Sequence, residues 1–238
     1  MTKSTARVPN RTLDLHDLDL PIYRAVLAKM DELKGKEAVS YLHPSKRWEY
    51  PWALERAQLA RGSHILDAGC GASIFPIYLA TQGYQVTALD LNLSSNLARL
   101  HDVSVNYVRG KLTALPLADN AFDAVFCISV IEHLGRDGIP AALNELRRVV
   151  RFGGKVLLTT DYYEDAEAEL WYEGPGESFQ VDWNFFDESL LRRLVLQAPG
   201  LRVEGAVDLG ADWEIVRAQM RRFHGYPYTS VGVALAKV

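Results

Sequence analysis

The residues from His64 to Ser73 (HILDAGCGAS) constrain the fold of this chain more than any other segment. A short apolar run, typical of a buried strand, ends in the carboxylate of Asp67. Gly69 and Gly71 follow, and glycines at these positions allow a tight turn in which the backbone approaches a ligand with no Cβ in the way. The pattern predicts an α/β fold with a ligand site at the carboxyl end of this strand.

A second acid stands at a fixed distance from this turn. Residues 84–89 read as another strand, and Asp90 follows it, twenty-one residues after Gly69, where a βαβ nucleotide-binding unit places an acid for the ribose hydroxyls. The alternative is an Asp that only caps a helix. A nicotinamide dehydrogenase would need a third glycine three residues after Gly71, but Ile74 stands there. This bulky residue favours a cofactor that carries no phosphate.

These segments resemble the first motifs of the class I S-adenosylmethionine-dependent methyltransferases. The resemblance implies S-adenosylmethionine as the cofactor. Its implied contacts within these motifs are Asp67, Gly69, Cys70, Gly71, Asp90 and Leu91.

Further along, residues 103–108 read as a third strand, and the segment after it resembles the one where the family often uses an acid to bind the adenine amino group. Lys111 occupies that position. A lysine only donates hydrogen bonds, so adenine recognition is expected to fall to backbone groups or to Leu112. Lys111 and Leu112 both remain cofactor-binding candidates.

Residues 122–134 resemble the fourth strand and the following loop of the small-molecule members of this family. A helical pattern over 139–150 comes next, and residues 155–160 then read as a fifth strand. Alternating strands and helices predict a doubly wound, Rossmann-like sheet that is mostly parallel and covered on both faces. By resemblance the sheet has seven strands, with an antiparallel last strand near 230–238.

The amino-terminal flank predicts a helical cap over residues 1–62, followed by the methyltransferase domain over 63–238. Helices are expected at 21–34 and 51–61, both packed over the cofactor cleft. Because relatives often use an upstream arginine or aromatic residue to meet the cofactor's carboxylate, Arg47 and Tyr50 are candidates for that contact. Alternatively, Tyr50 packs in the core and Arg47 is solvated.

The loop after the fourth strand contains the first candidate for a general base, His133, whose reference pKa of about 6.5 suits proton abstraction. Asp161, Tyr162 and Tyr163, just beyond the fifth strand, are the alternatives. His133 could instead only cap or pack the loop. Some relatives bind a divalent metal with Glu-x-x-Glu-His at this loop. The first of these positions is Ser129 here, so no metal is predicted, and Ser129 is assigned to the cofactor site instead.

The stretch from Val156 to Leu191 contains ten acids and eight tyrosine, tryptophan or phenylalanine side chains, with no lysine or arginine. A site for nucleic acid needs positive potential, so this composition favours a neutral or cationic small-molecule acceptor, methylated on oxygen or nitrogen. Trp171, Tyr172 and Trp183 are expected near it. The alternative is a solvated acidic helix. A catalytically inactive binding protein and an RNA methyltransferase are the competing functions.

Composition sets the remaining limits. With 48% hydrophobic residues and 24% charged residues, the chain is expected to form one substantial core. It has no apolar stretch of the roughly 20 residues that span a bilayer and no apolar leader after Met1, so a cytoplasmic protein without a membrane partner is expected. The two cysteines, Cys70 and Cys127, read as buried fillers rather than as a disulfide or zinc pair. The oligomeric state stays open.

Overall fold

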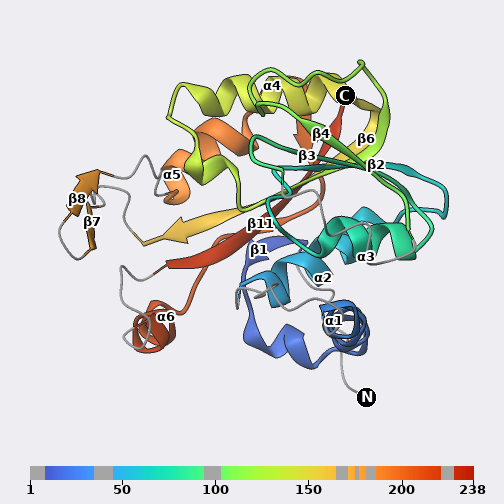
Figure 1. Cartoon of the computed structure of the whole chain (residues 1–238). Helices are drawn as coiled ribbons and strands as arrows, with labels where there is room; N and C mark the ends of the chain where they lie inside the picture. Colours follow the sequence, from blue (N-terminus) through green and yellow to red (C-terminus); the bar gives the residue numbers. More distant parts are fainter. Residues whose placement is uncertain are drawn as a thin grey trace.

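The computed structural model describes residues 9–34, 45–93, 103–164, 186–220 and 228–238, with the backbone of 171–174 and 177–180 (Figure 1). Its strands are β1 (Asn10–Thr12), β2 (His64–Ala68), β3 (Gln85–Asp90), β4 (Val105–Arg109), β5 (Phe122–Ile128), β6 (Val150–Tyr163), β7 (Trp171–Gly174), β8 (Glu177–Gln180), β9 (Leu201–Val203), β10 (Val207–Asp208) and β11 (Tyr228–Lys237).

The α-helices are α1 (Pro21–Lys34), α2 (Lys46–Ala57), α3 (Phe75–Thr81), α4 (Gly138–Val149), α5 (Glu188–Leu191) and α6 (Trp213–Met220). Two short 3-10 helices, η1 (Leu15–Asp19) and η3 (Ile131–His133), and one π-helical turn, η4 (Arg192–Leu196), complete the described elements.

Most of the strands form one sheet, in the order β10-β1-β11-β6-β5-β2-β3-β4, and β9 pairs with β11. The run β6-β5-β2-β3-β4 is parallel, whereas β11 is antiparallel to β6 over nine paired positions. The predicted doubly wound, mostly parallel sheet with an antiparallel last strand is thus confirmed. The count of seven strands is wrong, because β1, β9 and β10 extend the main sheet to nine.

Two hydrophobic layers cover the sheet, as Figure 1 shows, with α4 and α5 on one side and α1, α2 and α3 on the other. The first layer contains buried residues of α4 such as Leu143 and Leu146, packed with α5 and Phe186. The second contains Met30 of α1, Trp48 and Trp52 of α2, and residues of α3. Because both faces are covered, the central strands are apolar on both sides, which is typical of parallel sheets.

Helix α1 has the predicted bounds, but α2 begins at Lys46 rather than at Pro51 and ends at Ala57 rather than near Gly62. Pro51 therefore lies inside the helix, where it cannot donate the usual backbone hydrogen bond. Trp48 and Trp52 on either side are fully buried and stack with ring centroids 5.7 Å apart. Tertiary packing therefore sets the extent of α2 against its local propensity.

The amino-terminal segment predicted as a helical cap also contributes a strand to the main sheet. Strand β1 pairs antiparallel with β11 and parallel with β10, and Asn10 is fully buried. Its side-chain oxygen accepts a hydrogen bond from the Ala234 N–H at 2.6 Å. This segment is therefore integrated into the sheet, and the predicted boundary at residue 62 stays a prediction.

Candidate functional site

The turn after β2 has the backbone that its glycines predict. Gly69 has φ +84° and Gly71 has φ +53°, both in the left-handed region that favours glycine. A Cβ at Gly69 would lie 2.5 Å from Val130, whereas a Cβ at Gly71 would meet no atom within 4 Å. Gly69 thus permits close packing against the loop after β5, and Gly71 leaves open space where a ligand could approach the backbone.

Asp90, at the end of β3, holds this turn. Its two carboxylate oxygens accept hydrogen bonds from the Gly71 N–H at 2.8 Å and from the Asn92 N–H at 2.9 Å. The next residue, Leu91, is a large apolar side chain with 52% of its surface exposed. A carboxylate and an exposed apolar surface therefore lie next to the open side of the turn, an arrangement that fits a ribose with an attached base.

Asp67, at the carboxyl end of β2, is 3% exposed. Its Oδ2 atom is buried and has no hydrogen-bond partner among the described residues. Burial, followed by the neighbouring Asp90 carboxylate, raises the pKa of Asp67 to about 7, while Lys46 acts in the opposite direction. A buried carboxylate without a partner is costly, so this position is suited to a bound cation.

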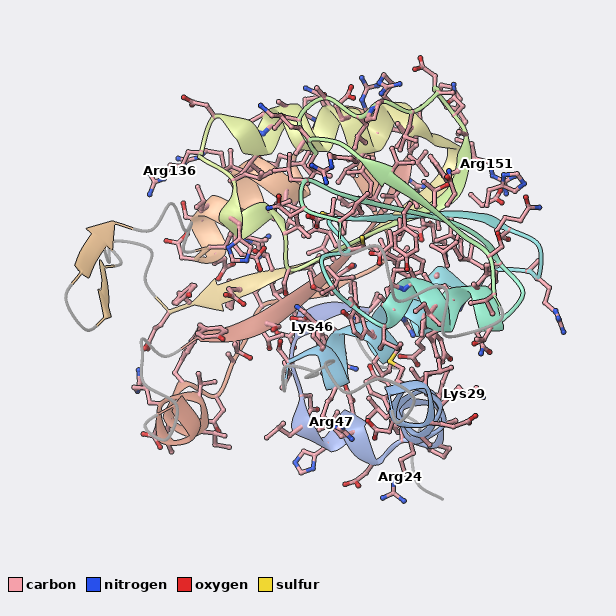
Figure 2. All side chains as sticks on the ribbon, in the orientation of Figure 1. Arg24, Lys29, Lys46, Arg47, Arg136 and Arg151 are labelled. Carbon is pink, nitrogen blue, oxygen red and sulfur yellow. The ribbon has the colours of Figure 1, made fainter. Side chains whose placement is uncertain are left out.

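The structure separates the two predicted carboxylate-binding residues. Tyr50 stacks on Phe75 with ring centroids 4.3 Å apart, and its hydroxyl lies 2.7 Å from the Ser73 Oγ, directly after the glycine turn. Arg47 instead points toward α1, where its guanidinium lies 3.7 Å from the Asp31 carboxylate and its side chain is 41% exposed (Figure 2). Its role at the cofactor site stays a prediction, and its partly exposed ion pair with Asp31 agrees better with the solvated alternative.

Lys46 and Glu49, which the sequence analysis did not select, form an ion pair close to Asp67 and His133. The Lys46 Nζ lies 2.5 Å from the Glu49 Oε2, and the Glu49 side chain is completely buried. The ammonium of Lys46 lowers the pKa of both Asp67 and His133. The sequence signal was present as a Lys and Glu three residues apart, but it became visible only once α2 was known to start at Lys46.

The predicted adenine contacts have different environments. Lys111 is exposed and forms an isolated backbone bridge with Ala114, whereas the Leu112 side chain is buried in the core beneath α4. Cys70 and Cys127 are both buried, free thiols, and burial raises the pKa of each. Both cysteines therefore stay protonated, in agreement with the predicted role as fillers.

Acidic and phenolic groups gather beyond β5 and at the end of β6. Glu132 and Asp161 are 1% and 6% exposed, and the Thr160 hydroxyl donates a hydrogen bond to Glu132 at 3.2 Å. Burial, followed by the charge of Asp161, raises the pKa of Glu132 well above its ordinary value. The rings of Tyr163 and Tyr228 lie 5.6 Å apart beside them.

The two faces of β6 separate the catalytic candidates, because neighbouring residues of a strand point to opposite sides. Tyr162 packs with Phe186 and Leu190 in the layer of α4 and α5. Asp161 lies opposite Ser230 and Tyr163 opposite Tyr228 across the β6–β11 ladder. The structure thus places Tyr163, and not Tyr162, on the same side of the sheet as Asp161; the catalytic role of each stays a prediction.

His133 lies at the end of η3 and is exposed. Desolvation by the groups around it and the charge of Lys46 lower the pKa of its imidazole. A lowered pKa leaves a neutral imidazole at neutral pH, which is the form that accepts a proton.

Ser129 has the left-handed backbone angle φ +52°, which is uncommon for a residue with a side chain. Its N–H donates a hydrogen bond to the Thr159 carbonyl of β6 at 3.0 Å. This unusual backbone carries the chain from β5 across toward the glycine turn.

Within the described ranges, no three His, Cys, Asp or Glu side chains are arranged to hold a metal ion. No helix in the same ranges has the length and apolar character to cross a membrane. The predicted acceptor contact Trp183 and the side chains of Trp171 and Tyr172 lie outside the part of the chain that the structure describes. The backbone at 171–174 is strand β7 and not the end of an acidic helix.

Comparison with known proteins assigns this geometry to a family. Residues 66–158, which run from β2 into β6, match the model of a family described as a methyltransferase domain. The matched region is a domain of the class I S-adenosylmethionine-dependent methyltransferases. Their cofactor, S-adenosylmethionine, is thereby confirmed for this domain.

Among curated relatives of this methyltransferase domain, a malonyl-(acyl-carrier protein) O-methyltransferase from Erwinia pyrifoliae is 40% identical over 108 residues, which are 45% of this chain and 40% of that protein. The chain thus spans less than half the length of the curated relative it matches.

Solved structures of methyltransferase folds cover more of the chain. A 1,6-didemethyltoxoflavin-N1-methyltransferase from Burkholderia thailandensis is 20% identical, with a TM-score of 0.60 over 95% of this chain and 94% of its own. The (4+2)-cyclase SpnF is 17% identical, with a TM-score of 0.62 over 91% of this chain and 93% of its own. At these identities the similarity supports the fold alone.

Proposed function

We propose that this protein transfers the methyl group of S-adenosylmethionine to an oxygen or nitrogen atom of a small-molecule acceptor. The observation that carries the proposal is the buried Asp67 Oδ2, which has no hydrogen-bond partner among the described residues and lies at the carboxyl end of the central strand. S-adenosylmethionine has an ammonium group that would neutralise this carboxylate. A phosphate-bearing nicotinamide cofactor has no equivalent group.

Each part of the cofactor has a counterpart in the site. Asp67 would receive the ammonium, and Lys46, which reaches the same buried region, would face the carboxylate in the role predicted for Arg47. Asp90 would receive the ribose hydroxyls beside Leu91, and the open space at Gly71 would admit the ligand to the backbone. When bound, the sulfonium supplies a methyl group that is already activated, so the protein's task is to align the acceptor with it.

The group of Glu132, Asp161 and Tyr163, here called the acceptor end of the site, supports a neutral or cationic small molecule as the methyl acceptor. Glu132 and Asp161 are buried next to each other, and they supply none of the positive potential that a nucleic-acid acceptor needs. An amine or hydroxyl could donate to these carboxyl groups. Of the similar proteins named above, one is named for O-methylation of malonyl-(acyl-carrier protein) and one for N1-methylation of 1,6-didemethyltoxoflavin.

A hydroxyl or protonated amine must lose a proton before it can accept the methyl group. His133 is one acceptor for that proton, because its lowered pKa keeps the imidazole neutral. Asp161, in contact with solvent only at 6% of its surface, is the second, with Tyr163 beside it. Alignment of the acceptor atom with the methyl group also accelerates the reaction. In well-aligned systems such positioning lowers the activation free energy by roughly 7 to 11 kcal/mol.

The decisive experiment has two stages. Thermal unfolding is first measured with S-adenosylmethionine, S-adenosylhomocysteine and NAD; the first two should stabilise the protein, by about 2.7 kcal/mol at one hundred times the dissociation constant, and NAD should not. Asp90→Ala should remove most of the shift. Methyl-labelled cofactor is then incubated with a metabolite pool and with total RNA. Label in RNA alone would refute the small-molecule assignment, and binding without any transfer would indicate an inactive domain.

A further inference from the structure

Glu49 of α2 has a completely buried carboxylate that joins three segments far apart in the sequence. Its Oε1 accepts hydrogen bonds from the Ser129 hydroxyl at 3.0 Å and from the Ser230 hydroxyl at 2.7 Å. Its Oε2 is paired with Lys46 at 2.5 Å. Both oxygens of Glu49 thus have partners, and this one side chain connects α2, the loop after β5 and the start of β11.

The hydrogen bond from Ser129 connects Glu49 to the turn after β2 that contains Gly69 and Gly71, here called the cofactor turn. Ser129, held by Glu49, has the strained left-handed backbone, and its N–H is fixed by the Thr159 carbonyl. The following residue, Val130, lies so close to Gly69 that no Cβ would fit between them. A shift of Ser129 would therefore move Val130 against the glycine turn, because a close-packed contact transmits displacement.

The hydrogen bond from Ser230 connects Glu49 to the acceptor end of the site. Ser230 lies opposite Asp161 in the β11–β6 ladder. The same carboxylate oxygen of Glu49 accepts from Ser129 and Ser230, so it fixes the distance between the cofactor side and the acceptor side of the site.

We propose that Glu49 is a positioning residue, which holds Ser129 and Ser230 through its Oε1 atom and thereby sets the cofactor turn relative to the acceptor end. This inference rests on the proposed function. It does not make Glu49 a catalytic residue, since the side chain acts through the two serines and through Lys46.

The test measures the dissociation constant of S-adenosylhomocysteine by titration calorimetry, together with KM and kcat. Glu49→Ala removes the acceptor for both serines and should raise the dissociation constant about tenfold or more. Glu49→Gln retains a carbonyl oxygen that can accept from both hydroxyls but loses the ion pair with Lys46, so it should recover only part, about threefold or more, of the affinity lost in Glu49→Ala. Ser230→Ala leaves the carboxylate in place, so it provides a milder variant, with an expected rise of about two- to fivefold, if Glu49→Ala does not fold.

Asp17 provides the matched control. It is also a fully buried carboxylate that anchors α2, because it accepts a hydrogen bond from the Trp48 Nε1 at 2.7 Å and pairs with Arg11. Asp17→Asn weakens this anchor without touching either serine, so cofactor affinity should stay within about twofold of wild type at a temperature where all variants are folded.

Three results would overturn the inference. Equal losses of affinity in Glu49→Ala and Asp17→Asn would show that α2 only needs to be anchored, and a Glu49→Gln variant as weak as Glu49→Ala would exclude positioning through the serine hydrogen bonds. Wild-type affinity in both Glu49→Ala and Ser230→Ala would exclude any role in cofactor binding. If the wild-type protein itself fails to bind S-adenosylhomocysteine, the proposed function fails first and this inference falls with it.

Discussion

A Cβ atom at Gly69 would lie 2.5 Å from the Cγ2 atom of Val130, so the turn after β2 and the loop after β5 meet where no larger residue fits. The contact joins the two segments that carry the strongest sequence motifs. Any change that pushes them apart should alter cofactor binding as well as stability.

Gly69→Ala should destabilise the protein by roughly 2 to 5 kcal/mol, because it combines a left-handed backbone with a steric clash. Gly62→Ala is the matched control, since Gly62 has a similar φ of +82° but no atom within 4 Å of its added Cβ. Chemical denaturation should give Gly62→Ala only the backbone cost, about 1 to 2 kcal/mol. Equal losses of stability in the two variants would show that Val130 can move away from the added Cβ at no cost in free energy.

The stability of the cofactor-free protein should depend on the pH through Asp67. Its folded-state pKa of about 7 lies above its ordinary value of 3.8, so the folded state binds more protons between these values. The contribution of Asp67 to the free energy of unfolding therefore falls as the pH rises through this window, by up to about 4 kcal/mol. Urea unfolding of wild type and Asp67→Asn from pH 5 to 8 should show the variant gaining relative stability with pH. A difference in the free energy of unfolding between the two proteins that stays constant from pH 5 to 8 would contradict the raised pKa of Asp67.

Cofactor affinity should have the opposite pH dependence, because the ammonium of the cofactor favours ionised Asp67. Binding of S-adenosylhomocysteine by the wild type should strengthen from pH 5.5 to 7 and level off above it. Calorimetry in two buffers of different ionisation enthalpy should detect proton release on binding below pH 7. Asp67→Asn should bind more weakly and lose this dependence; an unchanged pH profile in the variant would assign the ammonium to another group.

Tyr163→Phe should lower kcat/KM for the acceptor by about tenfold or more, because the phenol lies beside Asp161 and Tyr228 at the proposed acceptor end. Tyr162→Phe is the matched control on the opposite face of β6, where its ring packs with Phe186. Its rate should stay within about twofold of wild type. Initial rates of label transfer check the pair, and a greater loss in Tyr162→Phe would assign the role to Tyr162 instead of Tyr163.

Methyl transfer should not require a divalent cation, because Ser129 stands where metal-binding relatives have the first carboxylate. Incubation with a chelator, followed by removal of the chelator complex, should leave the initial rate unchanged. Loss of activity that only magnesium or manganese restores would instead assign Glu132 and His133 as metal ligands.

The central strands and the glycine turn were predictable because their signals are local. An apolar run followed by Asp67 or Asp90 identifies a buried strand and its carboxyl end, and β2, β3 and β5 lie where these runs are. The exact bounds of α1 follow from its helical periodicity in the same way. The positive φ at Gly69 and Gly71 also follows from residue type.

The parts that were missed depend on contacts between distant residues. Pro51 reads as a helix start, but packing of Trp48 and Trp52 extends α2 back to Lys46. This shift brings Lys46 and Glu49 into one helical turn, which the sequence alone did not indicate. Glu49 meets Ser230 across 181 residues, and no local pattern indicates such a pair. Strand β1 is only three residues long, so its alternation is too short to recognise.

The place of β11 between β1 and β6 has a consequence for how the protein acquires its structure during synthesis. Strand β1 and the carboxylate of Glu49 leave the ribosome about two hundred residues before their partners at 228–237. Closing such a long loop carries a large entropic cost, so these pairings belong to the slow, late stage of folding. The amino-terminal segment must therefore remain unpaired, and available to chaperones, until the chain that completes its sheet has been made.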